Sequence, residues 1–472
     1  MFILILITYT SAAYASPYDV YGTGGADSAT GLTGASSAAG PEALHYNVGA
    51  LVDATPGFDV GVLAAFNNVK ILMMDRPVGY DIPDLGADSP TQPSAADKPR
   101  QDTIGLPPLY GITLGGSADF GLDRLRIGAL VFLPTQSALT LDTHFSDERE
   151  RFASNKLHFE LIDQRLRRLD LQAGGAYRIT DWLSAGAGVI IAPIASMNND
   201  VTLQDAANQE DAQINLHADT GANYGWTLGA LVNISNTIKL GLSWRSPVII
   251  EMTGENKIYV MGTTDSNGEP QIITQKLSFI PSYTPGRANF GATWTGARHE
   301  VSLDARYTRW SQFLDTHGQA TDFNDTFSFG LGGKYKHAEH LELLGGVGFE
   351  PTPVPKQTGR TNYVDNSRGV VTAGARHKIA MGDRPLLLGW FVQLHVLMEQ
   401  TTQKDALDSY PDCSPGETAL CDEVPDDTRD TRSDSAYPDA RGLQTGNPGF
   451  PGWTSGGWIG GFGVELAWEP RP

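Results

Sequence analysis

The chain has 472 residues and a formal net charge of −20, and 40% of its residues are hydrophobic. The acidic balance argues against a nucleic-acid partner and against a polybasic protein of the membrane surface, since no basic patch offsets it. A helix that crosses a membrane needs about 20 continuous apolar residues, and the sequence contains no such run.

The first 15 residues have the pattern of a signal peptide. Phe2 to Ile7 form a short apolar core, and Ala13-Tyr14-Ala15 provides a cleavage site before Ser16. No Lys or Arg precedes the apolar core, which departs from the usual pattern, and a buried strand is the alternative interpretation. We expect residues 1–15 to be removed and the rest of the chain to be exported.

Residues 16–56 differ in composition from the rest of the chain. They are rich in Gly, Ala and Ser and show little strand pattern. From residue 57 on, strand-like segments recur almost to the end of the chain without a linker-like break. The sequence therefore predicts an N-terminal unit, residues 16–56, followed by one large β unit, residues 57–472.

Strict alternation of apolar and polar residues identifies the strands. In His299–Trp310, Val301, Leu303 and Ala305 alternate with polar residues, and a period of two places the two kinds on opposite faces of a strand. Fourteen segments of this kind are expected: Val60–Met73, Tyr110–Phe120, Leu125–Leu133, Leu169–Tyr177, Leu183–Ile191, Trp226–Val232, Ile238–Trp244, Ala288–Trp294, His299–Trp310, Phe327–Tyr335, Leu341–Phe349, Val371–Ile379, Leu386–Val396 and Phe462–Trp468.

Long and short connections alternate between these segments. An even number of strands with short periplasmic turns and long outer loops is typical of a transmembrane β-barrel of the bacterial outer membrane. A soluble sandwich or propeller would also alternate along its strands, but it would not explain this rhythm. Within one long connection, Asn267-Gly268 lies between strand-like runs and predicts a hairpin over Ile258–Lys276.

Several blocks of sequence resemble the FadL family of outer-membrane transporters for long-chain fatty acids and other hydrophobic compounds. They are Gly31-Leu32-Thr33-Gly34-Ala35 with His45-Tyr46-Asn47, then Leu240 to Val248 (LGLSWRSPV), Asp304 to Phe313, and Gly330 to Pro355. These blocks are arranged along the chain in the family's order. The resemblance implies an all-β fold, a 14-stranded antiparallel transmembrane β-barrel, with residues 16–56 as an N-terminal hatch (plug) in the lumen.

The resemblance also implies passive transport with lateral release through a kink in the third strand. That strand, expected here to run from Leu125 to Leu141, carries Phe132, Leu133, Pro134, Thr135 and Gln136. Proline removes a hydrogen-bond donor from the ladder, which suits an opening in the wall; a proline that simply ends the strand is the alternative. The family's hatch motif, Asn-Pro-Ala, is replaced here by Asn47, Val48 and Gly49, which keeps the asparagine but lacks the rigid proline.

Charged residues are expected on the lumen face of the barrel. Arg126, Arg168, Arg245 and Arg306 are candidate partners for a carboxylate, because the planar guanidinium donates two parallel hydrogen bonds. An ion-pair network that joins hatch and wall is the simpler interpretation. Gly345-Gly346-Val347-Gly348 does not open a helix, and we expect its glycines to let the hatch approach the wall closely.

The sequence predicts no enzyme, cofactor or metal site. It has no G-x-S-x-G motif, and His337 and His340 with Glu339 are expected in a solvated turn. Cys413 and Cys421 are the only cysteines; behind a signal peptide they predict a disulfide, whereas two thiols make a poor metal site. Residues 401–453 hold 11 acidic and 4 basic residues and form either a solvated loop or one that binds divalent ions.

These observations favour a passive outer-membrane transporter for hydrophobic small molecules such as long-chain fatty acids. We expect a monomer in a Gram-negative outer membrane, in contact with its lipid and lipopolysaccharide. The alternatives are a plugged structural or adhesive barrel and a water-filled porin. Whether residues 16–56 fill the lumen separates the porin from the others.

Overall fold

The computed structural model describes residues 16–74, 108–135, 168–192, 196–203, 212–221, 223–264, 268, 270–314, 320–357, 363–381, 384–403 and 452–468. Residues 1–15, Gln136, Cys413, Cys421 and most of the acidic segment 401–453 lie outside these ranges. The predictions made for them, the signal peptide and the disulfide included, stay predictions.

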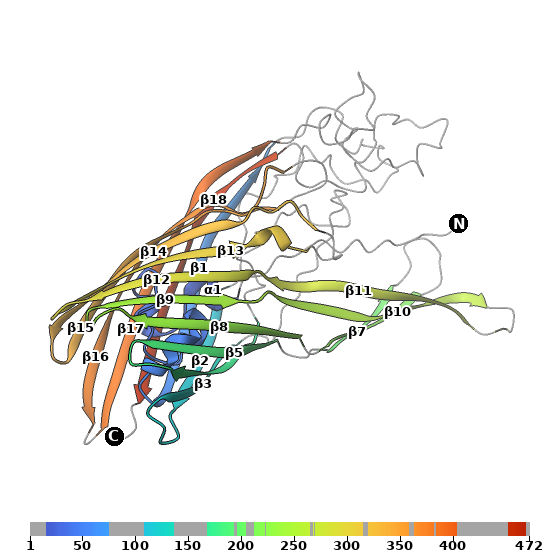
Figure 1. Cartoon of the computed structure of the whole chain (residues 1–472). Helices are drawn as coiled ribbons and strands as arrows, with labels where there is room; N and C mark the ends of the chain where they lie inside the picture. The colour runs from blue at the N-terminus through green and yellow to red at the C-terminus, as the bar shows by residue number, and fades with distance from the viewer. Residues whose placement is uncertain are drawn as a thin grey trace.

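Fourteen antiparallel strands close into a barrel (Figure 1). They are β1 (Gly57–Met73), β2 (Leu109–Ala118), β3 (Leu125–Pro134), β4 (Asp170–Arg178), β5 (Leu183–Ala192), β8 (Asn223–Asn233), β9 (Ile238–Arg245), β12 (Gly286–Thr295), β13 (His299–Arg309), β14 (Thr326–Ala338), β15 (Leu341–Glu350), β16 (Arg368–Met381), β17 (Arg384–Gln403) and β18 (Gly452–Trp468). The expected strands are all found, and the predicted fold class is confirmed.

Closure of the barrel gives every wall strand a paired neighbour on each side. The first strand, β1, pairs with β2 on one side and with the last strand, β18, on the other, so the wall has no free edge. In β13, Val301 and Leu303 are exposed on the outer face while Ser302 and Asp304 are buried on the inner face. The alternation in the sequence is therefore the alternation between lipid and interior.

The residue types on the two faces of β1 change along the strand, although the same alternate residues face outward throughout. Phe58, Val62 and Phe66 are exposed on its outer face. Past Asn67, the outer face carries the exposed Lys70 and the inner face carries buried apolar side chains such as Ile71. This part of β1, toward the long loops, therefore has a mixed outer face, with Asn68, Lys70 and Leu72 exposed, and an apolar inner face.

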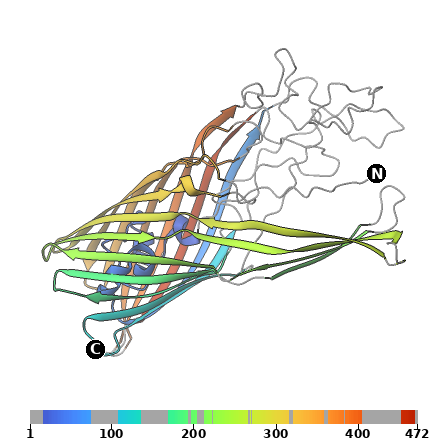
Figure 2. The same ribbon diagram turned by 45° about the vertical axis from the view of Figure 1, so that its right-hand side comes forward.

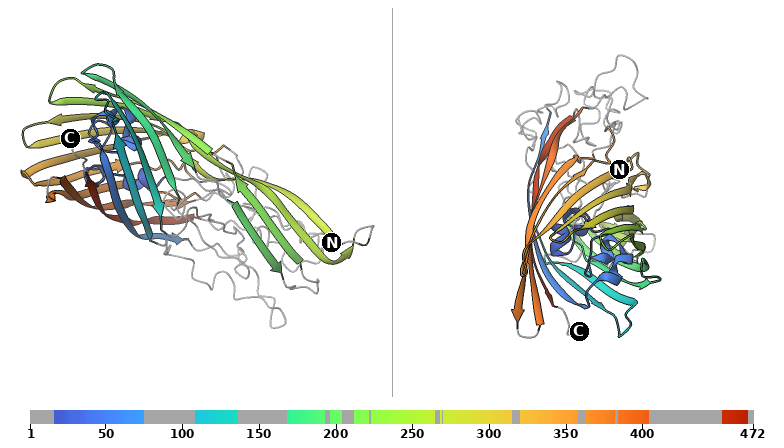
Figure 3. Two further views of the ribbon diagram at one scale, coloured as in Figure 1. Left: turned by 90° about the horizontal axis from the view of Figure 1, so that it is seen from below. Right: turned by 60° about the vertical axis from the view of Figure 1, so that its left-hand side comes forward.

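Two of the long connections form a second sheet. Its strands are β6 (Ser196–Leu203), β7 (Ala212–Thr220), β10 (Val248–Thr264) and β11 (Pro270–Thr284), in the order β11-β10-β7-β6. The sheet projects away from the barrel on the side opposite the short turns (Figure 3). The predicted hairpin over Ile258–Lys276 is found, with Ile258 opposite Ile273. The pairing of β10 with β7, which joins the two connections, was not predicted.

Residues 16–54 run inside the barrel (Figure 2). They form α1 (Pro17–Tyr21), α2 (Gly25–Ser28), α3 (Ala43–Tyr46) and the 3-10 helix η1 (Val48–Asp53), and most of their side chains are buried. Helix α2 packs against β16, β17 and β18, whereas η1 packs against β4, β5 and β8 on another part of the wall. Because the helices are short, their burial depends on the surrounding wall. We call residues 16–56 the interior segment.

Candidate functional site in the barrel interior

Asn47 ties the interior segment to the wall. Its side-chain Nδ2 donates hydrogen bonds to the carbonyl oxygens of Ala35, at 2.7 Å, and of Ala230 on β8, at 2.9 Å. Its Oδ1 accepts the N–H of Gly49 at 3.0 Å and so caps η1. All the hydrogen-bonding groups of this fully buried amide therefore have partners within the segment or on the wall.

Glycines on both sides of the contact allow the segment to lie against the backbone of the wall. A Cβ atom on Gly49 would be 2.7 Å from the Cα of Ala230, and one on Gly241 would be 1.8 Å from the carbonyl oxygen of Ala35. A Cβ on Gly346 would lie 2.2 Å from the amide nitrogen of Gly31. The close approach expected for the glycine-rich stretch of β15 is thus present. At position 49, where the family has Ala, a Cβ atom would overlap the backbone of Ala230, so this chain needs the glycine that it carries.

A buried charge cluster anchors α1. The carboxylate of Asp19 accepts hydrogen bonds from Arg245 on β9, at 2.5 Å, and from Arg287 on β12, at 2.8 Å. The second oxygen of Asp19 accepts the N–H of Ser16, which completes a capping box. His45 lies beside the cluster, with its Nε2 3.8 Å from Asp19. The three charged side chains are at most 6% exposed.

The cluster shifts the titration of both groups that the interior segment contributes. Burial by itself raises the pKa of Asp19, but Arg245 and Arg287 outweigh burial and hold it well below its usual range. Burial and the neighbouring Arg245 lower the pKa of His45 well below its usual range, although Asp19 opposes this effect. The seated segment therefore holds an ionised Asp19 and a neutral His45 at pH 7.

The other candidate arginines have different surroundings. Arg168 donates to the hydroxyl of Ser282 at 2.9 Å and lies 3.9 Å from Asp170. Arg306 donates to the carbonyl oxygen of Leu32 at 3.0 Å. Arg126 pairs with Asp119 at 3.0 Å, near the short-turn end. Of the four candidates, only Arg245 joins the Asp19 cluster. Their role as partners of a carboxylate stays a prediction.

Sequence reasoning missed two members of the cluster. Asp19 lies outside any strand pattern, so no periodicity placed it in the interior. Arg287 directly precedes the predicted strand Ala288–Trp294 and has the same phase as its inward-facing Asn289 and Thr293. Extending the alternation by one residue would have found Arg287. Its pairing with Asp19, however, spans 268 residues and is a property of the fold.

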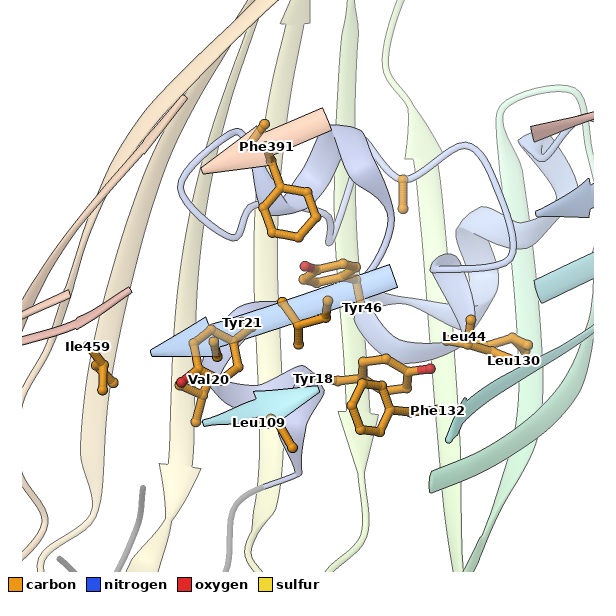
Figure 4. Close-up of a cluster of buried hydrophobic side chains, with 14 of the residues drawn as sticks. Tyr18, Val20, Tyr21, Leu44, Tyr46, Leu109, Leu130, Phe132, Phe391 and Ile459 are labelled. Atoms are coloured by element: carbon orange, nitrogen blue, oxygen red, sulfur yellow. The ribbon is translucent and has the colours of Figure 1, made fainter. Parts of the chain in front are cut away.

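Buried aromatic side chains lie beside the charge cluster. Tyr18 of α1 contacts Phe132 of β3 edge to face, with ring centroids 5.6 Å apart (Figure 4). They belong to one continuous apolar cluster that also contains the ring group Tyr283, Trp310, Phe313, Phe323 and Tyr363. Tyr283 lies at the barrel end of β11, Trp310 and Phe313 follow β13, and Phe323 and Tyr363 precede β14 and β16, so the group lies at the end of the barrel opposite the short turns. The apolar lining therefore extends from the long-loop end to the interior segment.

The expected exit segment occupies the end of β3. Phe132 is 1% exposed and turns inward, where its ring fills the space beside Gly111, whereas Leu133 is 37% exposed. Pro134 is the last residue of β3 and pairs with β2. Pairing of β3 with β4 is continuous and ends at Phe132. A wall opening at this place stays a prediction.

The contact between interior segment and wall leaves little free space. A cavity lined by Tyr18, Gly22, Thr113 and Phe132 has a volume of about 20 Å³, which is room for about one water molecule. In the described ranges, no helix is long and apolar enough to span a membrane. Nor does that part of the chain contain a group of three or more His, Cys, Asp or Glu residues arranged for a metal ion.

Comparisons of sequence and of structure with known proteins point to the same family. Residues 149–382 match the family described as "Outer membrane protein transport protein (OMPP1/FadL/TodX)". The "Long-chain fatty acid transport protein" of Escherichia coli (strain K12) is 21% identical over 262 residues, which cover 45% of this chain and 57% of that protein. The match thus spans little more than half the length of this curated relative.

Solved structures extend the similarity to nearly the whole fold. A FadL homologue from Pseudomonas aeruginosa aligns with a TM-score of 0.57 and 16% identity over 95% of this chain and 98% of that chain. The toluene transporter TodX of P. putida aligns with a TM-score of 0.56 and 14% identity, over 96% of this chain and 100% of that chain.

A closed barrel of 14 strands with apolar residues on its outer face defines an integral β-barrel protein of the Gram-negative outer membrane. Within that class, the matched sequence is similar to the FadL family of outer-membrane transport proteins, and the barrel is similar to the solved structures of FadL and TodX type.

Proposed function

We propose that this protein is a passive route for hydrophobic molecules, long-chain fatty acids among them, across the outer membrane. The observation that carries the proposal is the apolar lining of the barrel above the interior segment, with its group of buried aromatic rings. A porin has a polar, water-filled interior. An apolar lining instead offers a solute roughly 25 cal/mol for each Å² of apolar surface removed from water.

Residues 16–56 act as the hatch in this proposal. Asn47, the glycine contacts and the Asp19 cluster all hold the segment against the wall. A hatch explains how a barrel of 14 strands excludes water-soluble molecules while it admits apolar ones. A structural or adhesive barrel would also tolerate a filled interior, but it would not need a continuous apolar lining.

Arg245 and Arg287 form the receptor for a carboxylate head group. Two guanidinium groups face one carboxylate, Asp19, and the Nε atoms of both arginines lack a hydrogen-bond partner among the described residues. A fatty-acid carboxylate has the same chemistry as the side chain of Asp19. Exchange of one for the other would release α1 from the wall and so couple binding to movement of the hatch.

Uptake of labelled oleate by cells with and without the gene tests the function directly. We expect the gene to raise the initial rate of uptake, and unlabelled fatty acid to compete with the labelled one. A parallel series with toluene and hexadecane defines the range of solutes. If the gene changes uptake of neither oleate nor any of the hydrocarbons, the proposed function is wrong.

The same proposal assigns no catalytic activity, no cofactor and no metal to this chain. Its relatives are described as transport proteins. We propose that the barrel works as a monomer among outer-membrane lipid and lipopolysaccharide. A monomeric mass in native mass spectrometry after release from detergent is the corresponding result; a stable trimer, as in porins, would contradict it.

A further inference from the structure

A second cavity lies at the short-turn end of the barrel, apart from the Asp19 cluster. Its volume is about 500 Å³, and it lies at the turns that join β12 to β13 and β14 to β15 and at the ends of β16 and β17. By the usual orientation of such barrels, this is the periplasmic mouth. The cavity is large enough for a head group and several methylene groups.

Cationic side chains face into this mouth. Lys336 has the same strand phase as the inward-facing Gly332 and Lys334. Lys378 likewise has the phase of Thr372 and Arg376 on β16. Alternation along a strand therefore directs both ammonium groups to the concave side of the wall, where Arg298 joins them from the turn after β12.

Backbone hydrogen bonds hold the strand ends and turns that carry these cations. The N–H of Lys336 donates to the carbonyl oxygen of Arg298 at 2.9 Å, and the N–H of Lys378 donates to that of His340 at 2.9 Å. The strand ends are therefore ordered, while the long side chains are exposed to the mouth.

Three of the four cations lack a carboxylate partner. Arg376 is held by Glu342, with its Nε at 3.0 Å from a carboxylate oxygen. Arg298, Lys336 and Lys378 make no ion pair with any described residue. Glu339, the other acid at the cavity, is exposed in the turn. The chain as a whole has a net charge of −20. Three cations without ion-pair partners in one cavity therefore give this region a charge opposite to that of the chain.

Three other acidic groups of the interior lie away from this cavity. Asp59 on β1 and Glu465 on β18 line a different cavity, together with Glu42 of the interior segment. Glu465 accepts the N–H of Gly25 at 2.7 Å. An anion near the mouth is therefore repelled by the β1–β18 side and attracted to the β14–β16 side.

We propose that Arg298, Lys336 and Lys378 form a binding site at the periplasmic mouth for the anionic head group of an amphiphile. Leu341 and Leu387 line the same cavity and contact the first methylene groups next to the head group. The cations and the adjoining apolar side chains together select an amphiphile over a small inorganic anion. The site does not depend on the proposed uptake: a barrel that carries no fatty acid would still bind an anion here.

Protection of lysine amines from acetylation tests this site on the unaltered protein. The purified barrel is treated with an acetylating reagent in the presence of octanoate, octyl phosphate, inorganic phosphate or octyltrimethylammonium, and the modified lysines are quantified by mass spectrometry. We expect octanoate and octyl phosphate to slow the modification of Lys336 and Lys378. Lys70, exposed on the outer face of β1, is the internal control and should react at an unchanged rate.

The pattern of protection identifies the ligand. Stronger protection by octanoate than by octyl phosphate assigns the site to carboxylates, and the reverse order assigns it to phosphates such as phospholipid head groups. Protection by inorganic phosphate at equal strength contradicts the role of Leu341 and Leu387. Equal rates at all three lysines with every anion, or protection by octyltrimethylammonium, would overturn the proposal.

A pair of variants separates the site from general charge effects. Arg298→Gln removes one cation from the cavity and should weaken octanoate binding several-fold, by about the contribution of one partly exposed charge pair. Arg124→Gln removes a cation at the same end of the barrel, where it pairs with Asp181 outside the cavity. Protection should be unchanged in this variant, and an equal loss in both variants would contradict the proposed site.

Discussion

At the scale of single residues, the interior segment depends on a few buried polar groups with exact partners. Asp19 compensates two arginines that would otherwise be buried without a counter-charge, and removal of one partner from such a cluster leaves a costly unpaired charge. Asn47 satisfies two carbonyl oxygens, one on each side of the contact. These groups give the contact between segment and wall its specificity.

The free energy that holds the interior segment against the wall (its seated state) should become less favourable as the pH falls below about 6.5, the usual pKa of a histidine. The lowered pKa of His45 keeps it neutral when the segment is seated, whereas a released His45 takes up a proton. The released state then binds more protons, so stability decreases toward acid, by about 2 kcal/mol at pH 5. The lowered pKa of Asp19 adds its own loss only below about pH 4.

Hydrogen exchange of residues 43–53 at pH 7.5 and pH 5.0 measures this dependence. Exchange should be faster at pH 5.0 after correction for the intrinsic rate. His45→Gln keeps a polar side chain but cannot titrate, so the difference between the two pH values should become small. An unchanged pH dependence in His45→Gln would show that another group controls seating.

At the scale of elements, glycine positions on the wall strands set how closely the segment can approach. On β15 the neighbouring glycines 345 and 346 point to opposite faces. A Cβ on Gly346 would be 2.2 Å from Gly31, while a Cβ on Gly345 would have its nearest neighbour, an oxygen of Thr372, at 3.8 Å. The two glycines are neighbours in the same strand, but only Gly346 contacts the interior segment.

Gly346→Ala should loosen the segment, and Gly345→Ala should leave it seated. The added methyl group at position 346 overlaps backbone atoms that cannot move without displacing the segment, which costs about 1–3 kcal/mol. Single-channel conductance in planar bilayers is the measurement, and we expect more frequent openings only for Gly346→Ala. Equal conductance in the two variants would mean that this contact does not close the lumen.

At the scale of the whole molecule, the barrel and the interior segment are separable. Each wall strand is paired on both sides by other wall strands, so the backbone of the barrel needs no hydrogen bond from the segment. The segment, by contrast, depends on the wall for the burial of its short helices.

Deletion of residues 16–56 should therefore give a barrel that inserts into the outer membrane and conducts ions more freely. Heat-modifiable migration on gels reports the folded barrel, and planar-bilayer conductance reports the open lumen. A folded deletion variant with unchanged conductance would show that the lumen is closed by other residues.

The route out of the barrel is also a property of the whole molecule. Val131 of β3 lies opposite Leu171 of β4, within the pairing that must open for lateral release. A disulfide between cysteines at these two positions, in a Cys413→Ser, Cys421→Ser background, should reduce oleate uptake by at least about tenfold, since a closed ladder has no free edge. Reductant should restore uptake.

A disulfide at Leu303 and Leu331, which lie opposite each other on β13 and β14, is the matched control and should leave uptake unchanged. Normal uptake by the locked β3–β4 variant would direct attention to a path straight down, past the segment to the cationic mouth.

The local pattern of apolar and polar residues was sufficient to predict the strands of the barrel. Alternation with a period of two is present in consecutive residues, so each wall strand, the inward face of Arg245 and Arg306, and the hairpin over Ile258–Lys276 could be predicted without any knowledge of the fold. The even count and the rhythm of connections then predicted closure. The family resemblance added the interior segment, which has no periodicity of its own.

Only the tertiary structure decided which groups meet. The pairing of Asp19 with Arg245 and Arg287 joins residues more than 200 positions apart, and the pairing of β7 with β10 joins two connections that are independent in the sequence. The cations of the mouth likewise come from separate strands and turns. Such contacts depend on register and closure around the whole barrel, and a pattern that repeats every two residues carries no information about either.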